Sequence, residues 1–158
     1  SKIFYKKNHC YNFQYFDNGH YYDLKKNCKS RFRFKSGFPT VNFFTDDNAT
    51  QQFGYMHHKK GYNILPHRHN KRYSKIFWTT EVIIILEGIL RVDFYNDKEK
   101  YLHSKKLYKN DLIMLSAGGH GFKVLKDVKM IEVKQGPYSL KMDKIKFNQV
   151  DEKQIKIK

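Results

Sequence analysis

Four side chains between residues 67 and 120 carry the chemistry that this sequence suggests most directly. His67 and His69 follow a proline and are one residue apart, and Glu81 opens the β-branched run EVIIILEG. Residues two apart in a strand point to the same side, so both imidazoles would share one face. Glu81 would add an oxygen from a neighbouring strand, and His120, in GGHGF, a third nitrogen. This donor set suits a divalent metal ion, and it does not distinguish Zn, Fe, Mn, Ni and Cu.

The elements that must position these residues are predicted to be short strands separated by turns. From residue 51 onward, apolar and polar residues alternate over short segments, and polar turns are expected at 96–97 and 109–111. The stretch 70–80 is predicted to be an excursion between two strands. No convincing long amphipathic helix is present. Many short strands at regular spacing predict an all-β sandwich or barrel.

Two further breaks are predicted within the apolar runs. Glu87 and Gly88 are expected to form a bend, because the alternation changes phase there and restarts at Leu90. The segment 120–136 is predicted to be a hairpin folded at Lys126 and Asp127.

The domain organisation follows from composition. Residues 1–40 are rich in aromatic and basic residues and show no clear periodicity. We interpret them as an N-terminal extension, either a set of short strands or an arm that packs on the domain or on a partner subunit. Residues 41–147 are predicted to form the β-barrel, and residues 148–158 a C-terminal tail. At 158 residues, one domain with a real core is expected.

Composition also bounds the class of protein. No apolar run approaches the roughly 20 residues that span a bilayer, and the N-terminus lacks the apolar core of a signal peptide. A soluble cytoplasmic protein is therefore expected. Cys10 and Cys28 are too few and too far apart for a zinc knuckle or a disulfide framework.

The formal net charge of +16 raises the question of nucleic-acid binding. The excess lysine is spread along the whole chain with abundant Asn, Ile, Tyr and Phe, which is the composition that an AT-rich genome encodes. No helix-turn-helix, KH or RRM signature accompanies it. We therefore do not expect nucleic acid as a partner, and a basic surface favours small anionic ligands.

Two motifs resemble those of the cupin superfamily. The first consists of Gly61, five residues, His67-x-His69, then Glu81, six residues and Gly88, and the second is NDLIMLSAGGH at residues 110–120. The resemblance covers roughly residues 51–138. It implies a jelly-roll barrel of the double-stranded β-helix type, a homodimer, and a divalent metal held by His67, His69, Glu81 and His120. The chain also resembles a subgroup of small cupins linked to surface-polysaccharide and sugar-nucleotide biosynthesis.

Three hypotheses for function follow. The first is a metal-dependent enzyme, as an isomerase, lyase or oxygenase, that acts on a small sugar-derived or carboxylate-bearing molecule. The second is a metal-free sugar-nucleotide isomerase or epimerase in which His67 or His69 is the general base. The third is a non-catalytic ligand-binding or regulatory cupin. Tyr55 and His57 alternate on one side of a predicted strand and are candidate substrate contacts.

Overall fold

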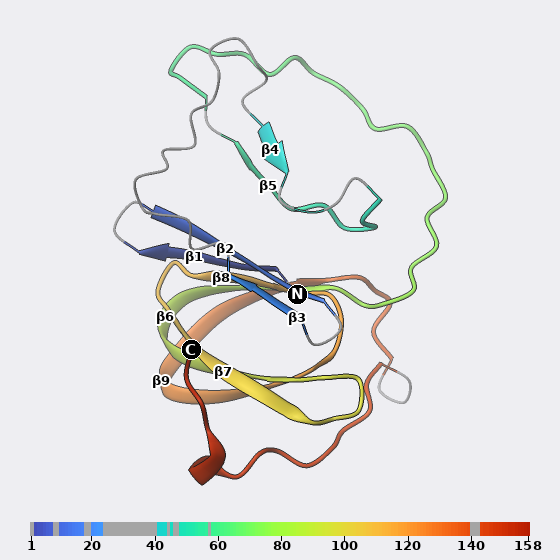
Figure 1. Ribbon diagram of the computed structural model, residues 1–158. Coiled ribbons are helices and arrows are strands. Elements are labelled where there is room, and N and C mark those ends of the chain that lie inside the picture. Colours follow the sequence, from blue (N-terminus) through green and yellow to red (C-terminus); the bar gives the residue numbers. More distant parts are fainter. Residues whose placement is uncertain are drawn as a thin grey trace. The chain divides into compact units, whose positions relative to one another are not determined.

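The structure is a computed structural model, and it describes residues 2–7, 10–17, 20–23, 41–43, 45, 48–56, 58–139 and 143–158 (Figure 1). Within these residues the secondary structure consists of nine strands and one 3-10 turn, without any α-helix. The predicted all-β class is confirmed. The jelly-roll barrel stays a prediction, because the described strands form one open sheet and one small separate pair.

The strands fall into two sheets. The large sheet has the order β3-β2-β1-β8-β6-β7, and β9 pairs with the other edge of β6; β4 and β5 pair only with each other. The elements are β1 (Lys2–Lys7), β2 (Cys10–Asp17), β3 (His20–Asp23), β4 (Val41–Phe43), β5 (Gly54–Met56), β6 (Glu81–Tyr95), β7 (Tyr101–Tyr108), β8 (Leu112–Leu115), β9 (Gly119–Lys134) and η1 (Glu152–Gln154).

The chain divides into two compact units, which we describe separately. One contains residues 1–25 and 78–158 with the large sheet, and the other contains residues 26–77 with β4 and β5. Strands β1 to β3, from the predicted N-terminal extension, pair within the large sheet. The predicted domain boundaries after residues 40 and 147 stay predictions.

Strand β6 is the centre of the large sheet. It pairs with β9 on one edge, and with β8 and then β7 on the other. Its valine and isoleucine side chains suit a strand that is buried on a face. Residues that are directly opposite in the register share a face of the sheet. One face therefore carries the core: Ile83, Ile85, Leu90, Val92 and Phe94 of β6, Leu107 of β7, and Ile113 and Leu115 of β8. We call it the core face.

The predicted bend at Glu87 and Gly88 is confirmed. Gly88 has φ +87°, and the register between β6 and β9 shifts on both sides of Glu87. A Cβ at Gly88 would lie 1.9 Å from the carbonyl oxygen of Asp127. Glycine is therefore required here by both the backbone conformation and the close approach of β9.

The predicted hairpin at Lys126 and Asp127 is wrong, because β9 continues through both residues as one strand. Lys126 is opposite Ile89, and Asp127 lies against Gly88, where the register with β6 is irregular. They form an irregularity in the pairing instead of a chain reversal, since β6 offers a partner along the full length of β9. Turn-forming residues alone did not distinguish a reversal of the chain from an irregularity in strand pairing.

The two predicted polar turns are confirmed. The side-chain oxygen of Asn96 accepts hydrogen bonds from the backbone N–H groups of Lys98 and Lys100, each at 3.0 Å. Asn110 adopts φ +69°, a left-handed conformation that asparagine tolerates. The Asp111 carboxylate accepts a 2.7 Å bond from the backbone N–H of Tyr108. These turns join β6 to β7 and β7 to β8.

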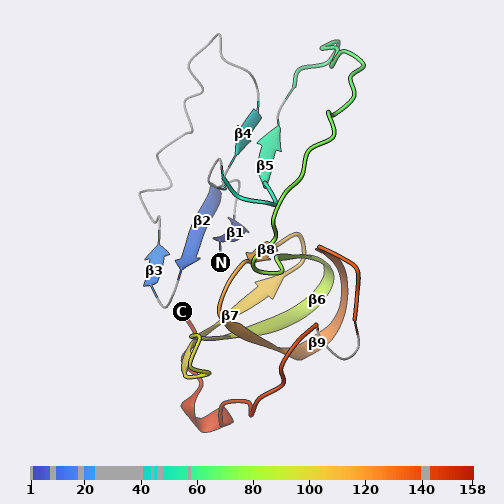
Figure 2. The same cartoon turned by 90° about the vertical axis from the view of Figure 1, so that its right-hand side faces the viewer.

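The large sheet is strongly coiled. His120 of β9 is opposite Phe94 near the end of β6, yet its ring bonds to Glu81 at the start of β6. Thirteen residues of straight strand would span roughly 43 Å. The curved ribbons of β6 and β9 in Figures 1 and 2 show how this distance is closed. The coil places the two ends of β6 side by side on the core face.

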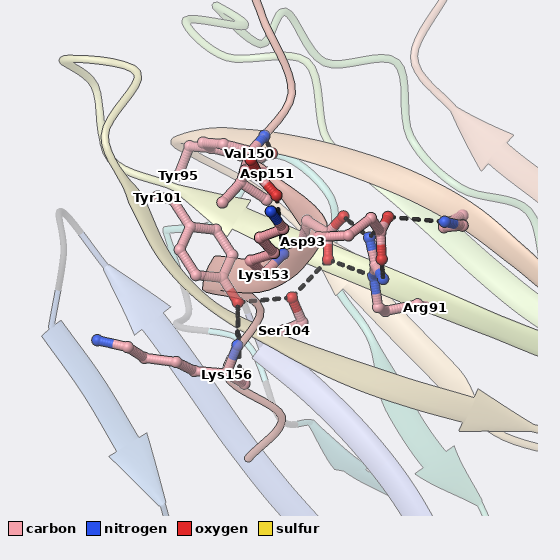
Figure 3. Close-up of polar contacts among 11 residues, drawn as sticks. Arg91, Asp93, Tyr95, Tyr101, Ser104, Val150, Asp151, Lys153 and Lys156 are labelled. Carbon is pink, nitrogen blue, oxygen red and sulfur yellow. Dashed lines mark hydrogen bonds and ion pairs between the residues drawn. The ribbon is translucent and has the colours of Figure 1, made fainter.

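The other face of β6 is buried around an ion-pair network (Figure 3). Arg91 donates two hydrogen bonds to Asp93, at 2.8 and 3.0 Å, and two to Glu152, at 2.7 and 2.9 Å. Ser104 of β7 also donates to Asp93. The Arg91 and Lys123 bonds lower the pKa of Glu152 to about 2. The network joins β6, β7 and β9 to the 3-10 turn.

The C-terminal segment on both sides of the 3-10 turn covers the rest of this face of β6. The backbone N–H of Val150 donates to the Tyr95 hydroxyl at 3.0 Å, and that of Lys156 to the Tyr101 hydroxyl at 2.8 Å. Ile157 forms a parallel bridge with Ser104 of β7. These contacts explain why all six residues from Leu90 to Tyr95 are buried, where alternation alone predicts burial on one side.

His103 is expected to make the fold sensitive to mild acid. Its side chain is buried on the core face, with its ring 4.9 Å from that of Phe94. Burial first, then the charges of Lys158 and Lys105, lower the pKa of His103 to about 4. Because its unfolded pKa is about 6.5, the unfolded state binds this proton first, and stability falls as the pH drops from about 6.5 to about 4.

The measurement is the melting temperature between pH 7 and pH 5, above the titration range of ordinary carboxyl groups. His103→Gln should flatten the slope of this curve, whatever its effect on stability at pH 7. An equal slope in both proteins would contradict the assignment.

Candidate functional site

Glu81 and His120 form a direct pair on the core face. Glu81 is opposite Leu115 of β8 and Lys134 of β9, and the coil of β6 brings its carboxylate to His120. The distance from His120 Nε2 to Glu81 Oε2 is 3.0 Å. The Glu81 side chain is 15% exposed and that of His120 is 28% exposed. The structure therefore brings together two of the four predicted metal ligands, and both side chains are partly exposed.

The electrostatics of this pair define which atom can take a proton. The hydrogen bond from His120 lowers the pKa of Glu81, against an opposing effect of burial and with smaller help from Lys134 and Lys144. An ionised carboxylate only accepts hydrogen bonds, so Nε2 of His120 must be the donor. In the neutral ring, Nδ1 is then the basic nitrogen. The arrangement is that of a histidine oriented by a carboxylate, as used in general acid–base chemistry.

An ion pair lies on one side of Glu81 and His120, and an aromatic ring on the other. Lys134 of β9 bonds to Asp143, and its ammonium group lies 5.0 Å from the centre of the Tyr138 ring. The ring of Phe122 is 5.3 Å from that of His120. Lys134 is the cation next to the Glu81 carboxylate in the register of β9, and its charge is shared with Asp143.

Gly119 keeps this end of the sheet tightly packed. A Cβ at Gly119 would lie 2.7 Å from the ring of Phe147, which in turn packs edge-on against Tyr95 at 5.0 Å. The residue before His120 is thus held by the segment that follows β9, and the backbone at His120 has little room to shift.

His67 and His69 form a second pair, in the unit of residues 26–77. The strand predicted for them is absent, because residues 58–79 contain no strand in the structure. Their ring centres are still only 5.4 Å apart, with planes at 78°. Nδ1 of His67 lies 2.9 Å from the carbonyl oxygen of Leu65, and both side chains are exposed. The two rings are thus close together, although the strand from which their shared face was predicted is absent.

The four-ligand metal site stays a prediction. Among the residues that the structure describes, no group of three or more His, Cys, Asp or Glu side chains could hold a metal ion. Of the candidate substrate contacts, Tyr55 lies in β5 and His57 lies outside the described residues. Both also stay predictions.

Comparisons with models of known protein families, with curated proteins and with solved structures found no match. The resemblance to the cupins therefore still depends on the two motifs alone. In the described part of the chain, no helix is long and apolar enough to cross a membrane.

Two features of the site went unrecognised in the sequence. Lys134 lies opposite Glu81. This position follows only from the pairing of β9 with β6 as one continuous strand, which the predicted hairpin did not provide. The contact between Glu81 and His120 needs the coil of β6, which places residues 39 apart within hydrogen-bond distance. The apolar residues of VKMIEVK suit the second strand of a hairpin as well as one long strand, so no local signal distinguished the two.

Proposed function

We propose that this protein binds a small anionic molecule on the core face of its coiled sheet and exchanges a proton with it through Glu81 and His120. The observation that carries the proposal is the 3.0 Å bond between the two side chains, partly exposed and flanked by Lys134. The resemblance to the cupins adds the chemical class, a sugar-derived or carboxylate-bearing molecule such as a nucleotide sugar. It also adds the homodimer, and the cytoplasmic location is proposed from the composition of the chain.

The chemistry assigns one role to each residue. His120 Nδ1 takes a proton from a carbon next to a carbonyl group, or from a hydroxyl group, of the ligand. Glu81 stays ionised and stabilises the resulting imidazolium through its bond to Nε2. Lys134, which pairs with Asp143 in the structure, would exchange this partner for the anionic group of the ligand. This is the chemistry of an isomerase or epimerase.

The test is the exchange of ligand protons with solvent. Nucleotide sugars and sugar acids are first screened by thermal shift, since a ligand of the folded state raises the melting temperature. The compounds that bind are then incubated in D₂O, and loss of carbon-bound proton signals is followed by NMR. Glu81→Gln and His120→Gln should each slow the exchange by about 100-fold or more, because loss of a general base costs this much.

Glu87→Gln is the matched control, because Glu87 belongs to the same strand and pairs with Lys129 in an exposed position. Its exchange rate should equal that of the unchanged protein. Binding without any exchange would favour the non-catalytic alternative, and equal rates in all variants would reject the roles of Glu81 and His120.

A divalent metal is the second candidate, favoured by the pairing of His67 and His69. Their rings are 5.4 Å apart, and imidazole nitrogens with one carboxylate oxygen suit Zn, Fe, Mn, Ni or Cu. In this alternative His67, His69, Glu81 and His120 would hold the ion, and the ion would polarise a ligand carbonyl or lower the pKa of a water molecule.

Elemental analysis of the purified protein tests this alternative. If it holds, about one metal ion per chain is expected, and replacing His67 and His69 by alanine should remove most of it while the far-ultraviolet circular dichroism is unchanged. A metal content that is unaffected by these substitutions would contradict the four-ligand site. If a chelator leaves the exchange of ligand protons with solvent unchanged, this result would support the metal-free function.

A further inference from the structure

Residues 59–77 form a long exposed segment, which we call the basic segment; the proposed chemistry of Glu81 and His120 does not use it. Every residue from 59 to 79 is exposed, and residues 58–79 contain no helix or strand. The conformational entropy that nineteen residues lose when they become ordered is ordinarily offset by burial of apolar surface within the fold. This segment buries little in its own unit, which is typical of a chain that completes its contacts on a partner.

The charge of the basic segment has one sign. It contains six lysine and arginine residues and two histidines, and no aspartate or glutamate occurs anywhere from residue 48 to residue 80. Over the whole chain, Lys and Arg outnumber Asp and Glu by only 31 to 15. The local excess therefore points to a polyanionic partner, although the charge spread over the whole chain did not, and the segment would repel a second copy of itself. The basic residues are Lys59, Lys60, Arg68, Lys71, Arg72 and Lys75.

Aromatic side chains alternate with this charge. Tyr62 is 60% exposed and Tyr73 is fully exposed. Phe77, the last residue of the segment, is 78% exposed. The Tyr62 ring stacks on that of His58, with centres 4.5 Å apart and planes at 13°. Flat rings presented in this way, between lysines and arginines along an extended backbone, are the elements with which proteins bind single-stranded nucleic acid.

We propose that the basic segment binds single-stranded nucleic acid without strong sequence preference. The lysines and arginines contact successive phosphates, and Tyr62 and Tyr73 stack on unpaired bases. A duplex hides the faces of its bases inside the stack, so it would engage only the charges. The proposal does not depend on Glu81 and His120, and either can fail alone.

Trp78 provides the readout. It is the only tryptophan, it directly follows the basic segment, and it is 59% exposed. Its fluorescence is titrated with single-stranded oligo-dT, with oligo-U, with duplex DNA of equal length and with anionic lipid vesicles, using the full chain. Saturable quenching by both single strands, at least about fivefold tighter than by duplex, is expected from stacking of one base.

Salt dependence measures the phosphate contacts. If all six basic residues engage, the slope of log affinity against log salt should be about −4, which is about a 300-fold loss between 50 and 200 mM. Replacing Lys71, Arg72 and Lys75 by glutamine should reduce the slope to about −2. The matched control replaces three exposed lysines of the β6–β7 and β7–β8 turns, Lys98, Lys100 and Lys109, and should leave the slope unchanged.

Substitution of the two tyrosines distinguishes nucleic acid from other polyanions as the partner. Tyr62→Ala with Tyr73→Ala should weaken oligo-dT at least about fivefold and leave heparin binding unchanged, and the phenylalanine pair should restore it. Because these side chains are exposed, the melting temperature should not change. Tighter binding to vesicles, equal binding of duplex and single strand, or equal loss of heparin binding would overturn the proposal.

Discussion

Gly88→Ala is expected to lower the free energy of unfolding by about 3 kcal/mol or more. Two costs combine at this position. The φ of +87° is strained for any residue with a Cβ, and the new methyl group would lie 1.9 Å from the Asp127 carbonyl oxygen. Since the obstacle is backbone of β9, relief would require β6 and β9 to separate at the bend. Urea unfolding followed by circular dichroism measures the effect.

Gly61→Ala is the matched control for this prediction. Gly61 has the same φ of +87°, but nothing lies within 4 Å of the position of a Cβ. Its substitution isolates the backbone strain and should cost about 1 kcal/mol or less. If both substitutions cost the same, the close approach of β9 at Gly88 is not a determinant of stability.

Asp93→Ala is expected to cost about 3–5 kcal/mol, because it leaves the Arg91 guanidinium buried with half of its partners. Both side chains are only 7% exposed, and the Asp93 carboxylate accepts bonds from Arg91 and Ser104. The remaining Glu152 lies on the other side of the guanidinium and cannot satisfy the same N–H groups. Chemical unfolding of the variant gives the value directly.

Glu87→Ala is the comparison on the same strand, because Glu87 pairs with Lys129 in an exposed position. Exposed ion pairs contribute about 0–1 kcal/mol, so this variant should be close to the unchanged protein. The double variant Arg91→Met with Asp93→Leu should recover part of the loss, since apolar side chains remove the unpaired charge. An Asp93→Ala cost no greater than that of Glu87→Ala would contradict the importance of the network.

The difference between these two ion pairs illustrates the limit of the sequence. Glu87 and Asp93 both stand in one apolar run, six residues apart, and alternation predicts that the residues between Leu90, Val92 and Phe94 point to solvent. Asp93 is buried only because the C-terminal segment, about 60 residues later, covers that face and supplies Glu152. No local pattern contains this information.

The same reasoning applies to the candidate site. The sequence predicted that Glu81 and His120 lie close together; their direct bond follows from the coil of β6. His67 and His69 also lie close together, but the strand from which this was predicted did not form. Lys134 was missed because an irregularity in β9 was interpreted as a hairpin.

By itself, the sequence determined the all-β class, the bend at Gly88 and the turns at Asn96 and Asn110. Each of these depends on backbone preferences or on alternation within a few residues, which act locally. The tertiary structure alone decided which turn-like residues reverse the chain, which face of β6 the C-terminal segment buries, and that Glu81 and His120 bond directly. These outcomes depend on strand register and on sheet coiling, which are set by contacts between residues far apart in the chain.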